Sequence, residues 1–349
     1  MKKTLLAVAV LGAFAGAASA QSSVTLFGVV DLSVNSVKNG ATTLKSMNSN
    51  QLSSNRLGFR GTEDLGGGMS ASFWLEGGMA NDVGTGGSAT EAGVNFQRRS
   101  TVSLTTSMGE IRLGRDYTSA FILDATYDVF GANGMGNASN VYAGANGDLG
   151  SKAGTLVRAN NMAAYFLPGG LGGVTGSLQV ALAENPAGGV VTGNGMVSGS
   201  LGYAAGPVSV GVAFAQTKTA TSNDFKVWNV GGSYNFGMVK VLGLYDKHTY
   251  GSLSYVTKQV SVSVPLGQGE FKAGYLMGNS SVSSISSKTL AGEYIYSLSK
   301  RTSLYGQVAE ATNKGASQNG LGMGITTEAD WKAGGKKATG FGLGVRHTF

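Results

Sequence analysis

Few side chains in this sequence could perform nucleophilic or metal chemistry. The chain has no Cys and only two His, at His248 and His347. Thiolate sites and multi-histidine metal sites are therefore excluded. Neither histidine is accompanied by a recognisable Ser and Asp arrangement, which a hydrolase needs as nucleophile, base and orienting group. The sequence predicts no enzyme activity, no metal and no cofactor.

Charge and composition narrow the class of protein. Charged residues make up 13 % of the 349 residues, about half the usual share of a soluble domain. The formal net charge is +7, but no run of Lys or Arg stands behind it, so nucleic-acid binding is not expected. The 57 Gly residues argue against long helices.

The first 20 residues have the pattern of an export signal. Lys2 and Lys3 precede an apolar stretch over residues 4–17, and Ala18-Ser19-Ala20 forms a small-residue cleavage site. This pattern predicts a bacterial signal peptide over residues 1–20 that is cleaved after Ala20. The remainder, residues 21–349, contains no linker and is expected to form one domain.

The rest of the chain alternates between apolar and polar positions. Examples are the runs over residues 24–34, 174–182, 256–264 and 339–345. A period of two places successive side chains on opposite faces of a strand. The runs have about the 9–11 residues that a tilted strand needs to cross a bilayer. No apolar run after residue 20 is long enough for a transmembrane helix.

The connections between these runs alternate in length. Short turns are expected at residues 64–68, 107–109 and 236–238, and longer polar loops at residues 36–51, 80–93 and 118–155. Short turns on one rim and long loops on the other are typical of transmembrane barrels. We count sixteen candidate strands. The prediction is an all-β, 16-stranded antiparallel transmembrane barrel.

Several segments resemble one family in order and spacing. Residues 23–31 resemble its opening strand, and residues 55–66 its second strand and turn. Residues 128–131 resemble an Asp-Pro-Phe-Gly signature, with Val129 in place of Pro, and the chain ends on the family's terminal Phe at Phe349. Residues 113–115 resemble the family's strand that leads into the loop with this signature, and residues 158–166 resemble the strand that follows that loop. The chain resembles a general trimeric porin of Gram-negative outer membranes, of the beta-proteobacterial type.

The resemblance implies a site inside the barrel. In that family the third extracellular loop, here residues 118–155, folds inward and narrows the pore, and arginines on the wall face acids on that loop. The arginines that match the family are Arg56, Arg115 and Arg158. Strand parity places Arg60 and Glu76 on the same lumen face, and of the adjacent Arg98 and Arg99 it favours Arg99 as the one that points inward. The expected constriction comprises Arg56, Arg60, Glu76, Arg99, Arg115, Asp124, Asp128 and Arg158.

The same resemblance implies the function and the partners. It implies a water-filled outer-membrane channel for passive diffusion of small hydrophilic solutes and ions, working as a homotrimer among outer-membrane lipids. Phe349 is implied to be the signal that the barrel insertion machinery reads. The residues assigned to the lumen hold six cations (Arg56, Arg60, Arg115, Arg158, Lys272 and Arg346) and five acids (Asp31, Glu76, Asp124, Asp128 and Glu293). Because four of the cations are placed near the neck, where the field is focused, we expect a moderate anion preference.

Two alternatives remain open at this point. One is a substrate-specific channel for sugars or organic acids. A sugar-specific channel would line the lumen with an aromatic track, and the two rings that face the lumen by parity, Phe27 and Trp74, do not make a track. A barrel-embedded hydrolase lacks the catalytic residues described above.

Overall fold

The computed structural model describes residues 23–40, 42–86, 93, 95–143, 154–183, 195–219, 223–282, 285–315, 317, 319–322 and 337–349. The signal peptide expected at residues 1–20 lies outside these residues. Nearly all of the described chain is β-strand, and every pair of neighbouring strands is antiparallel. The first strand, β1 (Ser23–Asn39), pairs with the last, β18 (Lys337–Thr348), so the sheet closes on itself.

The first half of the wall contains one divided strand position. The strands β2 (Thr42–Ser49) and β3 (Arg56–Gly66) pair one after the other with β1, so together they fill a single position. They are followed by β4 (Met69–Ala80), β6 (Arg99–Thr106), β7 (Gly109–Tyr117) and β8 (Arg158–Phe166). The two-residue β5 (Thr85–Gly86) only extends the end of β4. The wall therefore has the sixteen positions that the sequence predicts.

The second half of the wall is a run of hairpins between neighbours in the sequence. Its strands are β9 (Val174–Ala181), β10 (Met196–Ala205), β11 (Val208–Thr217), β12 (Phe225–Asn235), β13 (Lys240–Tyr250), β14 (Leu253–Leu266), β15 (Gly269–Ser280), β16 (Ser286–Ser297) and β17 (Thr302–Lys314). The short turns expected at residues 64–68, 107–109 and 236–238 are confirmed.

Two expectations about loops were wrong. The stretch 36–51, expected as a long loop, is mostly a tight hairpin, because β1 runs to Asn39 and β2 begins at Thr42. The stretch 118–155, expected to be without regular structure, contains α2 (Ser119–Tyr127) and α3 (Ala138–Ala143). The Thr118 hydroxyl caps α2 by accepting a hydrogen bond from the Phe121 N–H, which satisfies a donor that the first helical turn leaves free. Neither described helix is long and apolar enough to cross a membrane.

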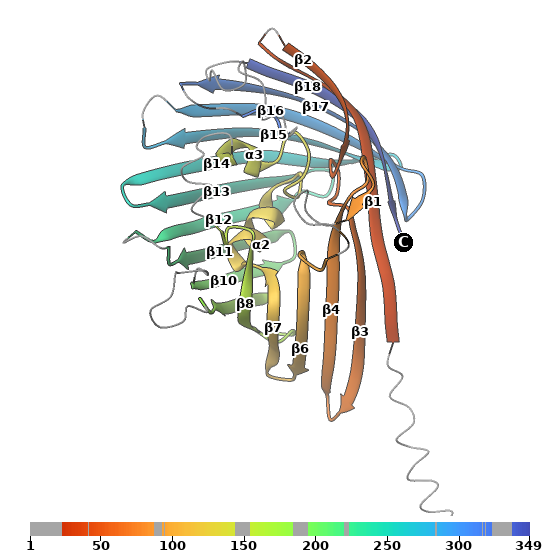
Figure 1. Cartoon of the computed structure of the whole chain (residues 1–349), viewed down its shortest axis with the longest axis vertical. Helices are drawn as coiled ribbons and strands as arrows, with labels where there is room; N and C mark the ends of the chain where they lie inside the picture. Colours follow the sequence, from red (N-terminus) through yellow and green to blue (C-terminus); the bar gives the residue numbers. More distant parts are fainter. Residues whose placement is uncertain are drawn as a thin grey trace, which may run out of the picture.

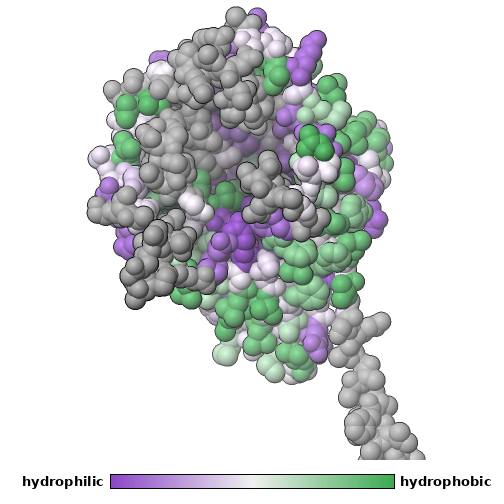
Figure 2. Space-filling view, viewed as in Figure 1, coloured by the Kyte–Doolittle hydropathy of each residue, from purple (hydrophilic) through white to green (hydrophobic). Residues whose placement is uncertain are grey.

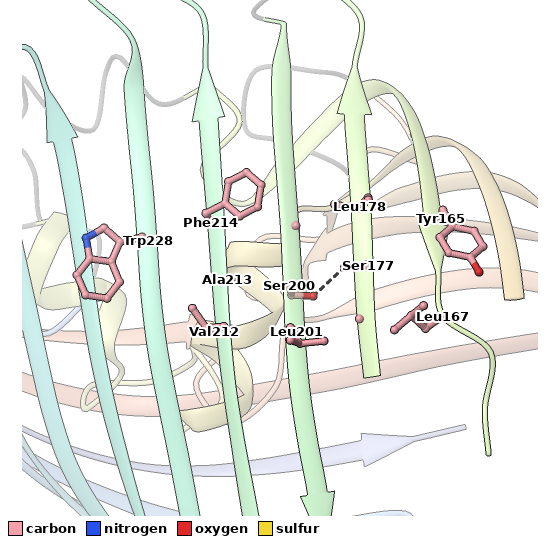
Figure 3. A pocket seen from close by; sticks show the side chains of 12 residues that line it. Tyr165, Leu167, Ser177, Leu178, Ser200, Leu201, Val212, Ala213, Phe214 and Trp228 are labelled. Carbon is pink, nitrogen blue, oxygen red and sulfur yellow. Dashed lines mark hydrogen bonds between the residues drawn. The ribbon is translucent and has the colours of Figure 1, made fainter. Parts of the chain in front are cut away.

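The two faces of the wall differ in chemistry. On β9, Ser177 is 8 % exposed and its hydroxyl bonds Ser119 of α2 inside the barrel, whereas the next residue, Leu178, is 62 % exposed. Figure 3 shows this apolar outer face, where Leu178, Phe214 and Trp228 stand on β9, β11 and β12. In Figure 2, hydrophilic residues gather around the central hollow and hydrophobic ones cover the outer wall below it. This is the in–out pattern of a barrel that spans a membrane.

The helical stretch lies inside the barrel. Figure 1 shows α2 and α3 within the curve of the sheet, and Leu123 and Tyr127 of α2 pack in one buried cluster with Val227 of β12 and Leu244 of β13. The Asn229 side chain donates a hydrogen bond to the Ala120 carbonyl at 2.8 Å. The expectation of an inward-folded third loop is confirmed.

Candidate pore constriction

The carboxylate of Glu76 on β4 is the centre of a group of arginines on the lumen wall. The Arg98 Nε atom lies 2.6 Å from Glu76 Oε1, and Arg56 Nη1, at the start of β3, lies 3.6 Å from the same oxygen. The other oxygen accepts a hydrogen bond from the Trp74 indole at 3.1 Å. Glu76 is buried. Both of its carboxylate oxygens are therefore engaged by neighbouring side chains.

A third arginine joins this group through Tyr117. The Arg98 guanidinium donates a hydrogen bond to the Tyr117 hydroxyl at 2.8 Å. The Arg158 guanidinium lies 4.1 Å above the Tyr117 ring, and its Nε donates to the Arg98 carbonyl at 2.8 Å. We call Arg56, Arg98 and Arg158 the upper arginine cluster. Three cations around one acid leave an excess of positive charge on this wall.

Arg115 reaches the same region by a different route. The register between β7 and β8 shifts between Gly114 and Asp116, so Arg115 stands at a β-bulge. Its guanidinium donates hydrogen bonds to the Gln97 carbonyl and to the Asn160 side chain. Arg115 lines a cavity of about 320 Å³ together with Arg98 and Arg158. The structure thus brings four arginines to one place.

The remaining two predicted arginines form a second group on the same wall. The Arg60 guanidinium lies 5.3 Å from the Phe27 ring centre and 5.1 Å from that of Trp74. The Arg99 guanidinium lies 4.6 Å from the Trp74 ring centre, and its Nε is 3.3 Å from Asp116. We call Phe27, Arg60, Trp74 and Arg99 the lower stack. Arg60 is therefore not in contact with the upper arginine cluster.

Both residues of the Arg98–Arg99 pair turn into the lumen. Arg99 is the first residue of β6 and follows the alternation of that strand. Arg98 precedes the strand, and its backbone N–H donates to the Glu76 carbonyl at 3.0 Å. Strand parity does not apply to a residue outside the strand, which is why the sequence argument selected only Arg99. It also missed Tyr117 and Arg112, which on β7 contacts Glu110 and Asp116.

The loop carboxylate of Asp128 is turned into the protein. It accepts hydrogen bonds from the backbone N–H groups of Phe130, Ala132 and Ala138 at 2.9–3.1 Å, and from the Gln259 side chain at 2.9 Å. These bonds fold the loop tip and fasten it to β14. Asp128 is buried and does not face the arginines.

The second loop carboxylate, Asp124 on α2, is also buried. It lines a cavity of about 10 Å³ between α2 and the wall, together with Asn229, Asp246 and His248. Burial raises its pKa well above the ordinary value, and the charges of Asp246 and Asp128 add to the effect. Within the described residues, the expected row of loop acids opposite the arginines is therefore not formed by Asp124 or Asp128, because both turn to the far wall.

The terminal Phe349 lies at the closure of the barrel. Its backbone exchanges two hydrogen bonds with Gly28 of β1, at 3.0 and 3.1 Å. Its ring covers Gly28 so closely that a Cβ atom there would overlap the ring. Among the described residues, no group of three His, Asp or Glu side chains is arranged to hold a metal ion.

Known proteins share this architecture. Residues 7–317 match the model of the Gram-negative porin family. The chain is 38 % identical to outer membrane porin protein 32 of Delftia acidovorans and 31 % identical to an outer membrane porin protein of Bordetella pertussis, with full coverage of both chains in each case. A solved structure, titled anion-selective porin from Comamonas acidovorans, is 35 % identical, with a TM-score of 0.80 over 94 % of this chain and 100 % of that one. The chain belongs to the Gram-negative porin family and is a channel of the outer membrane, not an enzyme.

Proposed function

We propose that this porin is a moderately anion-selective diffusion channel for small hydrophilic solutes, with its neck between the upper arginine cluster and the inward-folded loop. One observation carries the sign of the selectivity. The five acids assigned to the lumen (Asp31, Glu76, Asp124, Asp128 and Glu293) are each at most 4 % exposed. Arg60 is exposed, and the Arg56 side chain is 27 % exposed. Among these residues, a permeating ion therefore meets guanidinium groups in water and carboxylates behind protein atoms.

Coverage by protein changes the balance of charges in the pore. A count of six cations against five acids is close to neutral. An exposed charge acts directly on the water path, whereas a buried carboxylate is separated from that path by protein atoms. Asp31, for example, accepts bonds from the Leu52 and Ser53 N–H groups and from the Tyr305 hydroxyl. A positive field in a narrow channel concentrates anions. The relative described as an anion-selective porin supports the same sign.

The direct test is the reversal potential of the purified channel in a planar bilayer under a KCl gradient. Because K⁺ and Cl⁻ have matched mobilities, the sign of the potential reports the pore charge. We expect a potential on the anion side that decreases at high salt, since the Debye length falls to about 3 Å at 1 M. A potential on the cation side would contradict the proposal.

We further propose that three copies assemble through the outer faces of β1 and β18 and their neighbours. This outer wall carries the exposed Val24, Leu26, Leu343 and Val345. Small and aliphatic side chains allow two walls to approach closely. Native mass spectrometry in mild detergent should find trimers, and a monomer as the only species would contradict this arrangement.

Two further proposals concern export and assembly. Residues 1–20 act as a cleaved signal peptide, so N-terminal sequencing of the mature protein should begin at Gln21. Phe349 is read by the barrel insertion machinery, and its contact with Gly28 closes the seam between β1 and β18. Deletion of Phe349 should leave unfolded protein in the periplasm, and insertion at the normal rate would contradict this role.

A further inference from the structure

Arg60 differs from the other arginines on the wall from β3 to β8, which we call the arginine-bearing wall. Arg56, Arg98, Arg99, Arg112 and Arg158 each direct at least one nitrogen toward a carboxylate or a carbonyl. Within the described residues, Arg60 has no carboxylate within 4.0 Å of its guanidinium and makes no hydrogen bond through it. The residue is exposed. Its N–H groups therefore face the water of the lumen.

Aromatic rings hold this guanidinium in place. Its carbon lies 5.3 Å from the Phe27 ring centre and 5.1 Å from that of Trp74, and the two rings meet edge to face at 5.0 Å. Gly58 makes room for Phe27, since a Cβ there would stand 2.5 Å from its ring. Contact with aromatic faces fixes an arginine without using its N–H groups. A planar guanidinium with free N–H groups matches the two oxygens of a carboxylate.

The surroundings favour an acid that carries a ring. Phe27 and Trp74 are only half-buried, so parts of both rings border the lumen beside Arg60. Arg99 adds a second positive charge on Trp74. The nearby acids are engaged. Glu76 contacts Arg98, Asp116 contacts Arg99 and Arg112, and Asp64, near the end of β3, accepts a hydrogen bond from the Gly66 N–H.

The position lies beyond the neck. Arg60 is four residues after Arg56 on β3, toward the short turn to β4. At about 3.3 Å per residue, the separation along the strand is about 13 Å. Short turns lie on the periplasmic rim of such barrels.

We propose that Arg60, Phe27 and Trp74 form a binding site for small aromatic carboxylates on the periplasmic side of the neck. The carboxylate pairs with the Arg60 guanidinium, and the ring of the ligand contacts the exposed parts of Phe27 and Trp74. The site gives the channel a solute class that binds more tightly than chloride. It deepens the proposed anion channel and rests on it.

The test uses the fluorescence of Trp74 in the folded barrel. The chain has three Trp, so Trp228→Phe with Trp331→Phe leaves Trp74 as the only reporter. Benzoate, acetate and chloride are then titrated at constant ionic strength. We expect saturable quenching by benzoate at a concentration at least about 10-fold below that for acetate, because acetate has no ring to pack.

Two variants with a matched control identify the residues. Arg60→Lys keeps the charge but loses the planar fork and should raise the half-saturating benzoate concentration about 10-fold. Phe27→Leu removes one ring and should raise it as well, while Arg301→Lys on the exposed turn after β16 should not change it. Equal half-saturation by benzoate and acetate, or no change in both Arg60→Lys and Phe27→Leu, overturns the site.

The titration needs no ionic current, so it is independent of the proposed selectivity. A reversal potential on the cation side together with benzoate quenching would reject the anion channel and keep the site. An anion-side potential without quenching would reject the site and keep the channel.

Discussion

Two regions of the lumen carry charge in opposite ways. The wall formed by β1, β3, β4, β6, β7 and β8 presents guanidinium groups held by rings, carbonyls and a few carboxylates. The wall from β11 to β15 is covered by the inward-folded loop, and Asp246 of this wall and the loop acids Asp124 and Asp128 are buried between the two. Coverage by protein, more than the number of charges, therefore decides which sign of charge a permeating ion meets.

The largest effect is expected where the loop tip is fastened. Asp128→Ala removes four hydrogen bonds to a buried carboxylate. Buried donors left unpaired cost about 1–3 kcal/mol each, so the loss should exceed about 4 kcal/mol of docking free energy. Single-channel recordings should show large fluctuations or an enlarged conductance. Asp64→Ala, at the exposed end of β3, is the control. A quiet wild-type current from Asp128→Ala would show that this carboxylate does not hold the tip.

The next prediction removes the cover from the second wall. Gly231 on β12 lies directly under Tyr127 of α2, and a Cβ there would overlap the ring. Gly231→Val should displace α2, with an overpacking cost of about 1–3 kcal/mol, and the conductance should become larger or noisier. Gly243→Val on the neighbouring strand is the matched control, because nothing lies within 4 Å of its Cβ. Identical currents from both variants would mean that the helix tolerates the added side chain.

The third prediction weakens the arginine-bearing wall. Arg158→Ser and Arg56→Ser each remove one cation from the upper arginine cluster. One unit charge about 5 Å from an ion in water contributes about 0.8 kcal/mol, so each change should lower the concentration of anions at the cluster about fourfold and raise that of cations by a similar factor. The reversal potential in a dilute KCl gradient measures this shift. Arg301→Ser on the periplasmic turn should leave the potential unchanged, and an equal shift there would assign selectivity to net charge.

The smallest effect concerns the pH dependence of loop docking. Burial beside Asp246 and Asp128 raises the pKa of Asp124, and His248 lines the same cavity. Since the folded state favours the protonated form, this contribution is complete below the ordinary pKa of 3.8 and is lost as the pH rises through the raised pKa. Hydrogen exchange of the α2 amides should therefore become faster with pH beyond the intrinsic increase. Asp124→Asn should remove this extra pH dependence. Slower exchange of the α2 amides at alkaline pH in the wild type, after correction for the intrinsic rate, would contradict the prediction.

The barrel follows from the periodicity of the chain. A chain of strands with period two can satisfy its backbone in lipid only in a closed sheet, so the alternation predicts that Leu178 and Ser177 lie on opposite faces of the wall. The turns followed from Gly-rich runs such as residues 66–68, where three successive glycines have positive φ. Alternation also placed Arg56, Arg60, Glu76 and Arg99 on the lumen side.

The roles of the charged residues depend on contacts between segments that are far apart in the sequence. Asp124 and Asp128 lie on a loop with no strand parity. Their directions depend on how that loop packs on the wall, where Asn229 bonds the Ala120 carbonyl of α2 and Gln259 bonds Asp128, each across more than one hundred residues of sequence. Arg98 lies outside a strand, so its contact with Glu76 also could not be read from alternation. The division of the arginines into the upper arginine cluster and the lower stack depends on which ring or acid each one meets across neighbouring strands. Local periodicity fixes the face of the wall, whereas long-range packing fixes burial, and burial decides which charge reaches the water.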